Sequence, residues 1–235
     1  MSSSTWTPRA VASEAKAVEL VLWRAVEAQH IASTRRLVDS NAEQELLEAI
    51  LDETKPSMTE GSGKLHYLLA TPFRYPTTRG GSRFRSAADP GVFYAAEERR
   101  TACAEVGYWR WRFLTDSAGL DSLGPSAQTL FQVKAKGRAV DLRRKPFVRD
   151  QAKWRHPSDY GATQAFARAA REAPVALIRY ESVRDPGHAG CAALLDPSAF
   201  AARRPVAEQT WYLTVTKNAS SWRRDAEALE FGWKK

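Results

Sequence analysis

Four arginines stand close together in the stretch PFRYPTTRGGSRFRSAADPGVFYA, residues 72–95, with aromatic residues and a glycine pair among them. Guanidinium groups hold phosphate oxygens through paired hydrogen bonds, glycine lets the backbone approach an anion, and aromatic rings stack on bases. The stretch therefore predicts a loop that binds a nucleotide or dinucleotide, and a solvated basic loop is the alternative. The arginines are Arg74, Arg79, Arg83 and Arg85.

Glu105 lies in TACAEVGYWRWRF, residues 101–113, a stretch that predicts a helix. At 100° per residue, Glu105 borders an apolar stripe made of Ala102, Val106, Trp109 and Phe113, which we expect to be buried. A glutamate at such a border is most often solvated or paired with an arginine. If this helix and the strand ending at Tyr94 flank the arginine loop, however, a carboxylate, an aromatic ring and several guanidiniums share one cleft. That combination suits cleavage of a glycosidic bond in a nucleotide, where the carboxylate stabilises an oxocarbenium-like transition state.

A third candidate is RYESVRDPG, residues 179–187, which follows an apolar strand. Ser182 and Arg184 stand at the strand end, where polar side chains are often functional, although the turn residues Asp185–Gly187 also explain the polarity. Other sites find no support. The chain has neither GxGxxG, GxxxxGK[ST] nor GxSxG, and its four histidines show no metal-ligand spacing, so we expect no metal.

The elements that must position these residues predict an α+β fold. Strand-like runs occur near 66–72, 91–95, 129–135, 175–180 and 210–215, and helices are expected at about 98–114 and 162–172. Long irregular stretches at 74–90 and 141–160 interrupt the alternation and argue against a doubly wound sheet.

Residues 1–60 predict a helical extension to a main domain at 61–235. Apolar residues from Val11 to about Ile31 recur at helical spacing, and Asn41 with Gln44 resembles a capping box that opens a second helix through Leu51. A Ser/Thr/Gly-rich linker at 57–63 follows.

The net charge of +8 predicts an anionic partner, which could be nucleic acid, a phosphorylated ligand or an acidic protein. Two cysteines without a paired framework suit a reducing compartment. The start MSSSTWTPR is not a signal sequence and no apolar run reaches 18 residues, so we expect a cytoplasmic protein without a membrane span.

The order of PFRY, GSRF, GVFYAA, the glutamate eleven residues after Tyr94, and RYESVRDP resembles the RES domain, the toxin of RES–Xre toxin–antitoxin modules. The resemblance covers roughly Tyr67 to Val215. It implies an ADP-ribosyltransferase-like α+β fold with a split central β-sheet, flanking helices and a cleft for NAD. Members of the family consume NAD by hydrolysis or phosphorolysis of the bond to nicotinamide, so NAD is the implied substrate and inorganic phosphate a possible second one. Some relatives ADP-ribosylate a protein.

The resemblance also implies roles for individual residues. It makes Glu105 the catalytic carboxylate, with Tyr94 facing nicotinamide and Ser182 supporting the ribose. Arg74, Tyr75 and Arg83 would contact NAD, and Arg74 would assist catalysis. The implied partner is an Xre-type antitoxin that blocks the cleft, and nucleic acid would be reached only through it.

Three functions are therefore open at this point. The leading hypothesis is an NAD-degrading toxin with NAD glycohydrolase or phosphorylase activity. A protein mono-ADP-ribosyltransferase would keep the fold and change the acceptor. A nucleic-acid-binding protein or nuclease toxin would explain the positive charge in a different way.

Overall fold

The computed structural model describes residues 6–28, 61, 63–75 and 81–234, with Ser40, Ala42, Glu43, Leu46 and Ile50. The elements in chain order are α1 Pro8–Glu14, β1 Lys16–Glu27, α3 Tyr67–Arg74, β2 Phe93–Ala96, α4 Arg99–Asp116, β3 Ser122–Asp141, the 3₁₀ helix η2 Phe147–Asp150, α5 Gln151–Trp154, α6 Gly161–Glu172, β4 Leu177–Glu181, β5 Gly190–Leu194, the 3₁₀ helix η3 Pro197–Ala199, β6 Ala207–Thr216, β7 Ser220–Arg224 and β8 Glu227–Phe231.

One mixed sheet of eight strands organises the molecule, in the order β1-β2-β5-β4-β3-β6-β7-β8, with β1 also paired to β3. Strand β3 is its spine, because it pairs with β1 along all twelve residues of that strand, with β6 antiparallel and with β4 parallel. Strand β1 meets β2 at a single residue pair, Trp23 and Ala96, and the two strands part on either side of it. The sheet is therefore split at this point, between the long strands β1, β3 and β6 and the short strands β2, β5 and β4.

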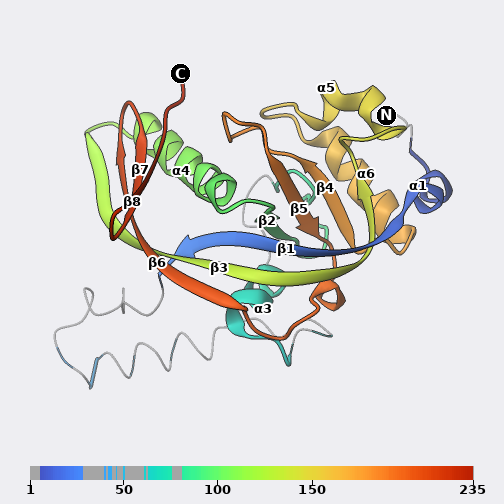
Figure 1. Cartoon of the computed structure of the whole chain (residues 1–235), viewed down its shortest axis with the longest axis horizontal. Helices are drawn as coiled ribbons and strands as arrows, with labels where there is room; N and C mark the ends of the chain where they lie inside the picture. The colour runs from blue at the N-terminus through green and yellow to red at the C-terminus, as the bar shows by residue number, and fades with distance from the viewer. Residues whose placement is uncertain are drawn as a thin grey trace.

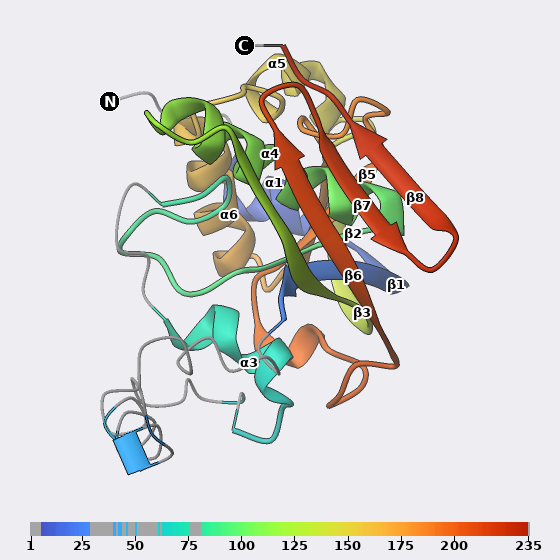
Figure 2. The ribbon, with the colours of Figure 1, turned by 90° about the vertical axis from the view of Figure 1, so that its left-hand side faces the viewer.

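Helices cover both faces of the sheet, as Figure 1 shows, with α4 and α6 on one side of the long strands and α3 on the other. Alternate residues of β5 face the two sides, Cys191 and Ala193 toward the cluster under α6, and Ala192 and Leu194 toward the cluster under α3. Helix α4 packs its own cluster against β6 and β7, where Trp211 is fully buried. The view in Figure 2 shows β6, β7 and β8 as successive neighbours at one end of the sheet.

The predicted helix over residues 11–31 is wrong for residues 16–27, and residues 29–31 lie outside the described part of the chain. Helix α1 ends at Glu14, and residues 16–27 form strand β1, in which Val18, Leu20 and Leu22 alternate toward the core under α3. The apolar residues of this segment fit both the helical period and the two-residue period of a strand. The strand forms because the segment pairs with β3 along twelve residues. The predicted helical extension is consequently not seen in residues 16–27, which share the sheet of the main domain. Most of the expected helix at 41–51 lies outside the described residues.

The expected strand at 66–72 is wrong as well, because Tyr67–Arg74 forms helix α3. The His66 ring accepts the backbone N–H of Leu68 at 3.4 Å as an N-cap, and Leu69 and Phe73 are buried one turn apart. An apolar run this short carries no clear period of its own. The helices expected at 98–114 and 162–172 are confirmed, as are the strands near 91–95, 129–135, 175–180 and 210–215.

No helix among the described residues combines the length and apolar character that a membrane span requires. In the same part of the chain, no group of three or more His, Cys, Asp or Glu side chains could hold a metal ion.

Candidate active site

A cavity of about 430 Å³ opens where β1 and β2 part. Its walls come from strands β1 and β2, the loop at 81–83, helix α4, strands β4 and β5, and the segments carrying Tyr160 and Arg184. Its size is that of small-molecule sites in proteins. The split in the sheet is thus what makes room for a ligand.

Glu105 lies on the wall formed by α4 and its carboxylate is held by Ser182, whose Oγ donates a hydrogen bond to Oε1 at 2.6 Å. The Ser182 hydroxyl also accepts the backbone N–H groups of Arg184 and Asp185, at 3.2 and 2.9 Å. Ser182 is fully buried and does not itself line the cavity. It therefore acts on the cavity through Glu105, and it fixes that carboxylate to the loop after β4.

Burial raises the pKa of Glu105 above its ordinary value. The hydrogen bond from Ser182 and the charges of Arg83 and Arg184 oppose this shift, while the nearby Asp185 adds to it. A half-buried carboxylate in such surroundings is typical of functional sites.

The apolar stripe predicted for this helix is buried in the core only at its first residue, Ala102, whereas Trp109 lines the cavity and Phe113 lies at the surface. Trp109 and Phe113 are 52% and 55% exposed, whereas Gly107 and Trp111 pack inward. Gly107 lets α4 approach β7 closely, since a Cβ there would come within 2.4 Å of the Ser220 Oγ. The glutamate does border the stripe, and both belong to the ligand side of α4.

Tyr94 on β2 lines the cavity and fixes the loop beside it. Its hydroxyl shares a hydrogen bond of 2.7 Å with the Ser82 Oγ and accepts the Phe84 N–H at 2.9 Å, and burial raises its pKa. The next residue of that loop, Arg83, also lines the cavity. It donates to the Trp154 carbonyl at 2.6 Å and lies over the Tyr160 ring at 4.9 Å.

Arg24 on β1 is a cavity residue that the sequence analysis missed, because its segment was assigned to a helix. Its Nη1 donates to the Tyr94 carbonyl at 2.7 Å and its guanidinium lies 4.6 Å from the Phe93 ring centre. Its Nε is buried and has no hydrogen-bond partner among the described residues. Burial lowers the pKa of Arg24 to about 10, which is the signature of a cation without a counter-ion.

Arg184 completes the set of cations and is only 8% exposed. Its guanidinium lies 4.1 Å from the Tyr108 ring centre and 5.3 Å from that of Trp109, and its Nη2 donates to the Pro157 carbonyl. Within the described part of the chain, Arg24, Arg83 and Arg184 form no salt bridge. Three guanidiniums thus share the cavity with one carboxylate, which makes it a site for an anionic ligand.

A sequence profile of the RES domain matches residues 60–216 of the chain. The chain belongs to the RES-domain family. Among curated proteins, none matches this sequence. In structure the chain is similar to the toxin in the M. tuberculosis MbcT–MbcA toxin–antitoxin complex, with 12% sequence identity and a TM-score of 0.51. The similarity covers 88% of this chain and 91% of that chain, so the two chains share a fold, and the mixed sheet with helices on both faces confirms the predicted α+β class with a split central sheet.

The RES motifs predicted to contact NAD divide into two groups in space. Arg83, Tyr94 and Glu105 line the cavity, whereas Arg74 and Tyr75 at the end of α3 do not. Tyr75 is 40% exposed, and its carbonyl accepts a hydrogen bond from Arg85.

The described arginine that remains in the predicted loop, Arg85, does not line the cavity. Arg85 is buried and also donates to the Asp89 carbonyl, so it is engaged in holding the loop together. Arg79 lies outside the described residues. Arg24, from a segment that precedes the matched RES region, lines the cavity, and the role predicted for Arg74 stays a prediction.

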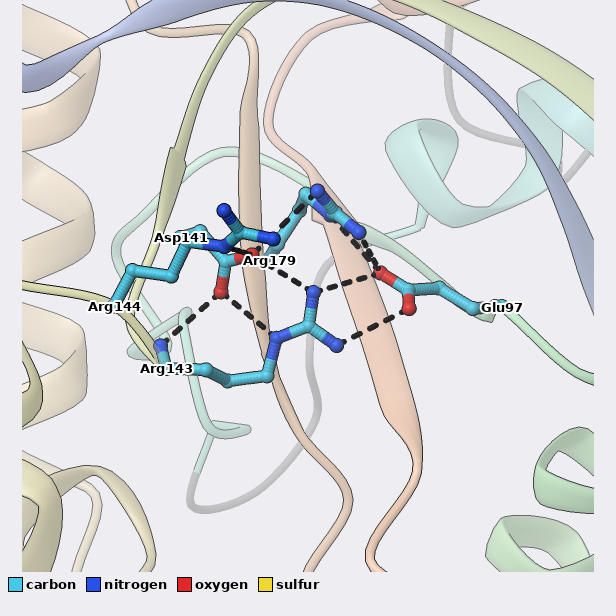
Figure 3. Close-up of polar contacts among 5 residues, drawn as sticks. All are labelled: Glu97, Asp141, Arg143, Arg144 and Arg179. Carbon is cyan, nitrogen blue, oxygen red and sulfur yellow. Dashed lines mark hydrogen bonds and ion pairs between the residues drawn. The ribbon is translucent and has the colours of Figure 1, made fainter.

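A second charged cluster lies outside the cavity and links residues at β2, β3 and β4 through hydrogen bonds and ion pairs (Figure 3). Arg143 and Arg179 each contact both Glu97 and Asp141, at 2.6–3.1 Å in their shortest pairs, apart from a longer contact of 3.5 Å between Arg179 and Asp141. Burial acts to raise the pKa of Asp141, but hydrogen bonds and charge from Arg143 lower it overall. This network stabilises the fold, because its carboxylates and guanidiniums satisfy one another's hydrogen-bonding groups.

The cavity also contains a thiol, Cys191. Burial raises its pKa well above the ordinary value, so that thiolate chemistry is disfavoured there. The carboxylate of Glu105 is accordingly the group in this cavity best suited to act on a developing positive charge.

Proposed function

We propose that this RES domain cleaves the bond between nicotinamide and ribose in NAD. One observation carries the proposal: a half-buried carboxylate, Glu105, shares a cavity with three guanidiniums that form no ion pair with any carboxylate among the described residues. NAD combines the two features that such a site complements, an anionic pyrophosphate and a ribose that becomes cationic as nicotinamide departs.

In this proposal the pyrophosphate of NAD binds to the guanidiniums of the cavity. Arg24, Arg83 and Arg184 donate to pyrophosphate and ribose oxygens, and the buried Nε of Arg24 acquires its missing acceptor. Binding then relieves the electrostatic penalty of an uncompensated buried cation.

The bond-breaking step uses Glu105. The bond from the ribose C1′ to the pyridinium nitrogen breaks, its electron pair goes to that nitrogen, and neutral nicotinamide leaves. The carboxylate, oriented by Ser182, stabilises the positive charge that develops on the ribose. Water then bonds to C1′ and releases a proton, which yields ADP-ribose; inorganic phosphate as acceptor yields the ribosyl phosphate instead.

Purified protein incubated with NAD tests this directly, with free nicotinamide measured by chromatography. We expect turnover by the wild type and a loss of about 100-fold or more in Glu105→Gln, the scale found when one preorganised electrostatic contact is removed. Glu98→Gln, on the residue before α4, is the matched control and should keep wild-type turnover. Absence of nicotinamide release by the wild type would refute the proposal.

The acceptor is decided by a second measurement on the same reaction. If the protein is a glycohydrolase, labelled NAD should give free ADP-ribose. If it is a phosphorylase, labelled NAD should give phosphorylated ADP-ribose when inorganic phosphate is added. Label on protein would instead favour the mono-ADP-ribosyltransferase alternative.

We further propose that the chain is the toxin of a toxin–antitoxin module, neutralised by an Xre-type antitoxin. Membership of the RES family and the fold shared with the toxin of the MbcT–MbcA complex support this. An acidic segment of the antitoxin would complement the cationic cavity. Expression of the wild type should arrest growth, Glu105→Gln should not, and co-expression of a helix-turn-helix protein encoded beside this gene should restore growth. Arrest that persists in Glu105→Gln would refute this role.

A further inference from the structure

Trp109 is an aromatic side chain that the fold leaves at the edge of the cavity. It lies on α4 one turn beyond Glu105 and on the same face, it lines the cavity, and it is nevertheless 52% exposed. Large aromatic side chains are usually well buried, so a half-exposed tryptophan on a cavity wall indicates a ligand or partner contact.

The ring of Trp109 contacts one aromatic ring and one cation. Tyr108 packs edge-on against it with ring centres 5.3 Å apart, and the Arg184 guanidinium lies 5.3 Å from its centre. The backbone carbonyl of Arg184 accepts the Trp233 indole N–H at 2.7 Å, which fixes the loop that carries the cation. The Trp109 ring can stack on a base, and the neighbouring Arg184 guanidinium can bind the phosphate attached to that base.

We propose that Trp109 is the stacking platform for the adenine base of NAD, and that Arg184 beside it binds the adenylate phosphate. This inference rests on the proposed function, since it assigns the second half of the same substrate. The single helical turn between Glu105 and Trp109 corresponds to about 6 Å along the axis, so the dinucleotide must bind in a bent form. An adenine site at Trp109 also predicts that the protein binds dinucleotides more tightly than nicotinamide mononucleotide, which lacks the adenylate half.

Phe113 provides a matched control on the same helix. It lies one further turn from Glu105, is 55% exposed, and is not part of the cavity wall. If exposure of an aromatic ring on α4 served only a partner protein, the two residues would behave alike toward small ligands.

The test compares steady-state NAD cleavage by the wild type, Trp109→Ala, Trp109→Phe and Phe113→Ala. Loss of one base stack should raise KM for NAD in Trp109→Ala by roughly five- to 150-fold, with a much smaller change in kcat. Trp109→Phe should recover part of the loss, and Phe113→Ala should match the wild type. Thermal melting of all four proteins should agree within a few degrees, because both side chains are largely exposed.

Inhibition by fragments identifies which half of NAD is affected. The inhibition constant of ADP-ribose, which contains adenine, should rise in Trp109→Ala by the same factor as KM, while that of nicotinamide mononucleotide should stay constant. An unchanged KM, or equal weakening of both inhibitors, would overturn the adenine site. If the wild type binds ADP-ribose in calorimetry but releases no nicotinamide from NAD, the proposed reaction is refuted. The adenine site is then tested by calorimetry alone: it predicts weaker binding of ADP-ribose to Trp109→Ala, and unchanged binding would overturn it.

Discussion

Replacing Arg24 by methionine separates the energy of folding from the energy of binding at this site. Burial lowers the pKa of Arg24 from 12.5 to about 10, which corresponds to about 3 kcal/mol by which the folded protein disfavours the charged form. Arg24→Met removes that penalty. It also removes the hydrogen bond to the Tyr94 carbonyl, worth about 1.5–3 kcal/mol, and the contact with the Phe93 ring, worth about 1 kcal/mol.

These opposing terms nearly cancel, so the free energy of unfolding of Arg24→Met should lie within about 2 kcal/mol of the wild type. Affinity should behave differently, because a charge-assisted contact to the ligand is lost without compensation. The dissociation constant of ADP-ribose should rise roughly 10- to 150-fold, from the same 1.5–3 kcal/mol.

The assay is calorimetric titration with ADP-ribose together with urea unfolding of the ligand-free proteins. Arg138→Met is the control, since Arg138 on β3 also donates to a backbone carbonyl, that of Ala12, but lies on the surface away from the cavity. Wild-type affinity in Arg24→Met would refute the role of Arg24 in ligand binding. A loss of stability above about 4 kcal/mol would refute the electrostatic reasoning, because it would make Arg24 a structural residue.

Three further predictions follow from individual contacts. Ser182→Ala removes a hydrogen bond that lowers the pKa of Glu105, so this pKa should rise further and the acid limb of the kcat/KM profile should move to higher pH; a superimposable profile would contradict this. Asp141→Asn should destabilise the protein most at neutral pH. The pKa of Asp141 is lower in the folded than in the unfolded protein, so its carboxylate contributes stability above the unfolded pKa of about 3.9, and this stability is lost as the pH falls through the folded pKa. The difference in free energy of unfolding between wild type and Asp141→Asn, measured in urea, should therefore be smaller at pH 3 than at pH 7. Tyr94→Phe leaves two hydrogen-bond partners of its hydroxyl unsatisfied and should lower stability by about 1–3 kcal/mol in urea unfolding, whereas Tyr212→Phe, at a residue that is 53% exposed, should not.

The sequence identified the parts of the site that sit in short, chemically dense motifs. Glu105 could be picked out because it borders the apolar stripe of a predicted helix, Tyr94 because it stands at the end of a predicted strand, and Arg83 because its loop is rich in arginine and aromatic residues. All three line the cavity. Helix α4 could be predicted within two residues of its observed ends, since its eighteen residues contain neither proline nor a turn signal.

What the sequence could not supply was long-range pairing. Arg24 reaches the cavity because β1 pairs with β3 across more than 100 residues of chain, and local periodicity in β1 is compatible with a helix. The alternation of Val18, Leu20 and Leu22 was a usable signal for a strand. Similarly, Trp109 belongs to an apolar stripe, and only the packing of another side of α4 on β6 and β7 reveals that Trp109 faces the cavity.

The most direct test of the central claim is a crystal structure of Glu105→Gln soaked with NAD. This substitution keeps the hydrogen bond from Ser182 within reach and blocks turnover, so the intact dinucleotide should be trapped. We predict that the bond between nicotinamide and ribose lies against the substituted side chain, with the pyrophosphate on Arg24, Arg83 and Arg184. NAD bound elsewhere on the protein, or bound in the cavity with that bond remote from position 105, would contradict the account.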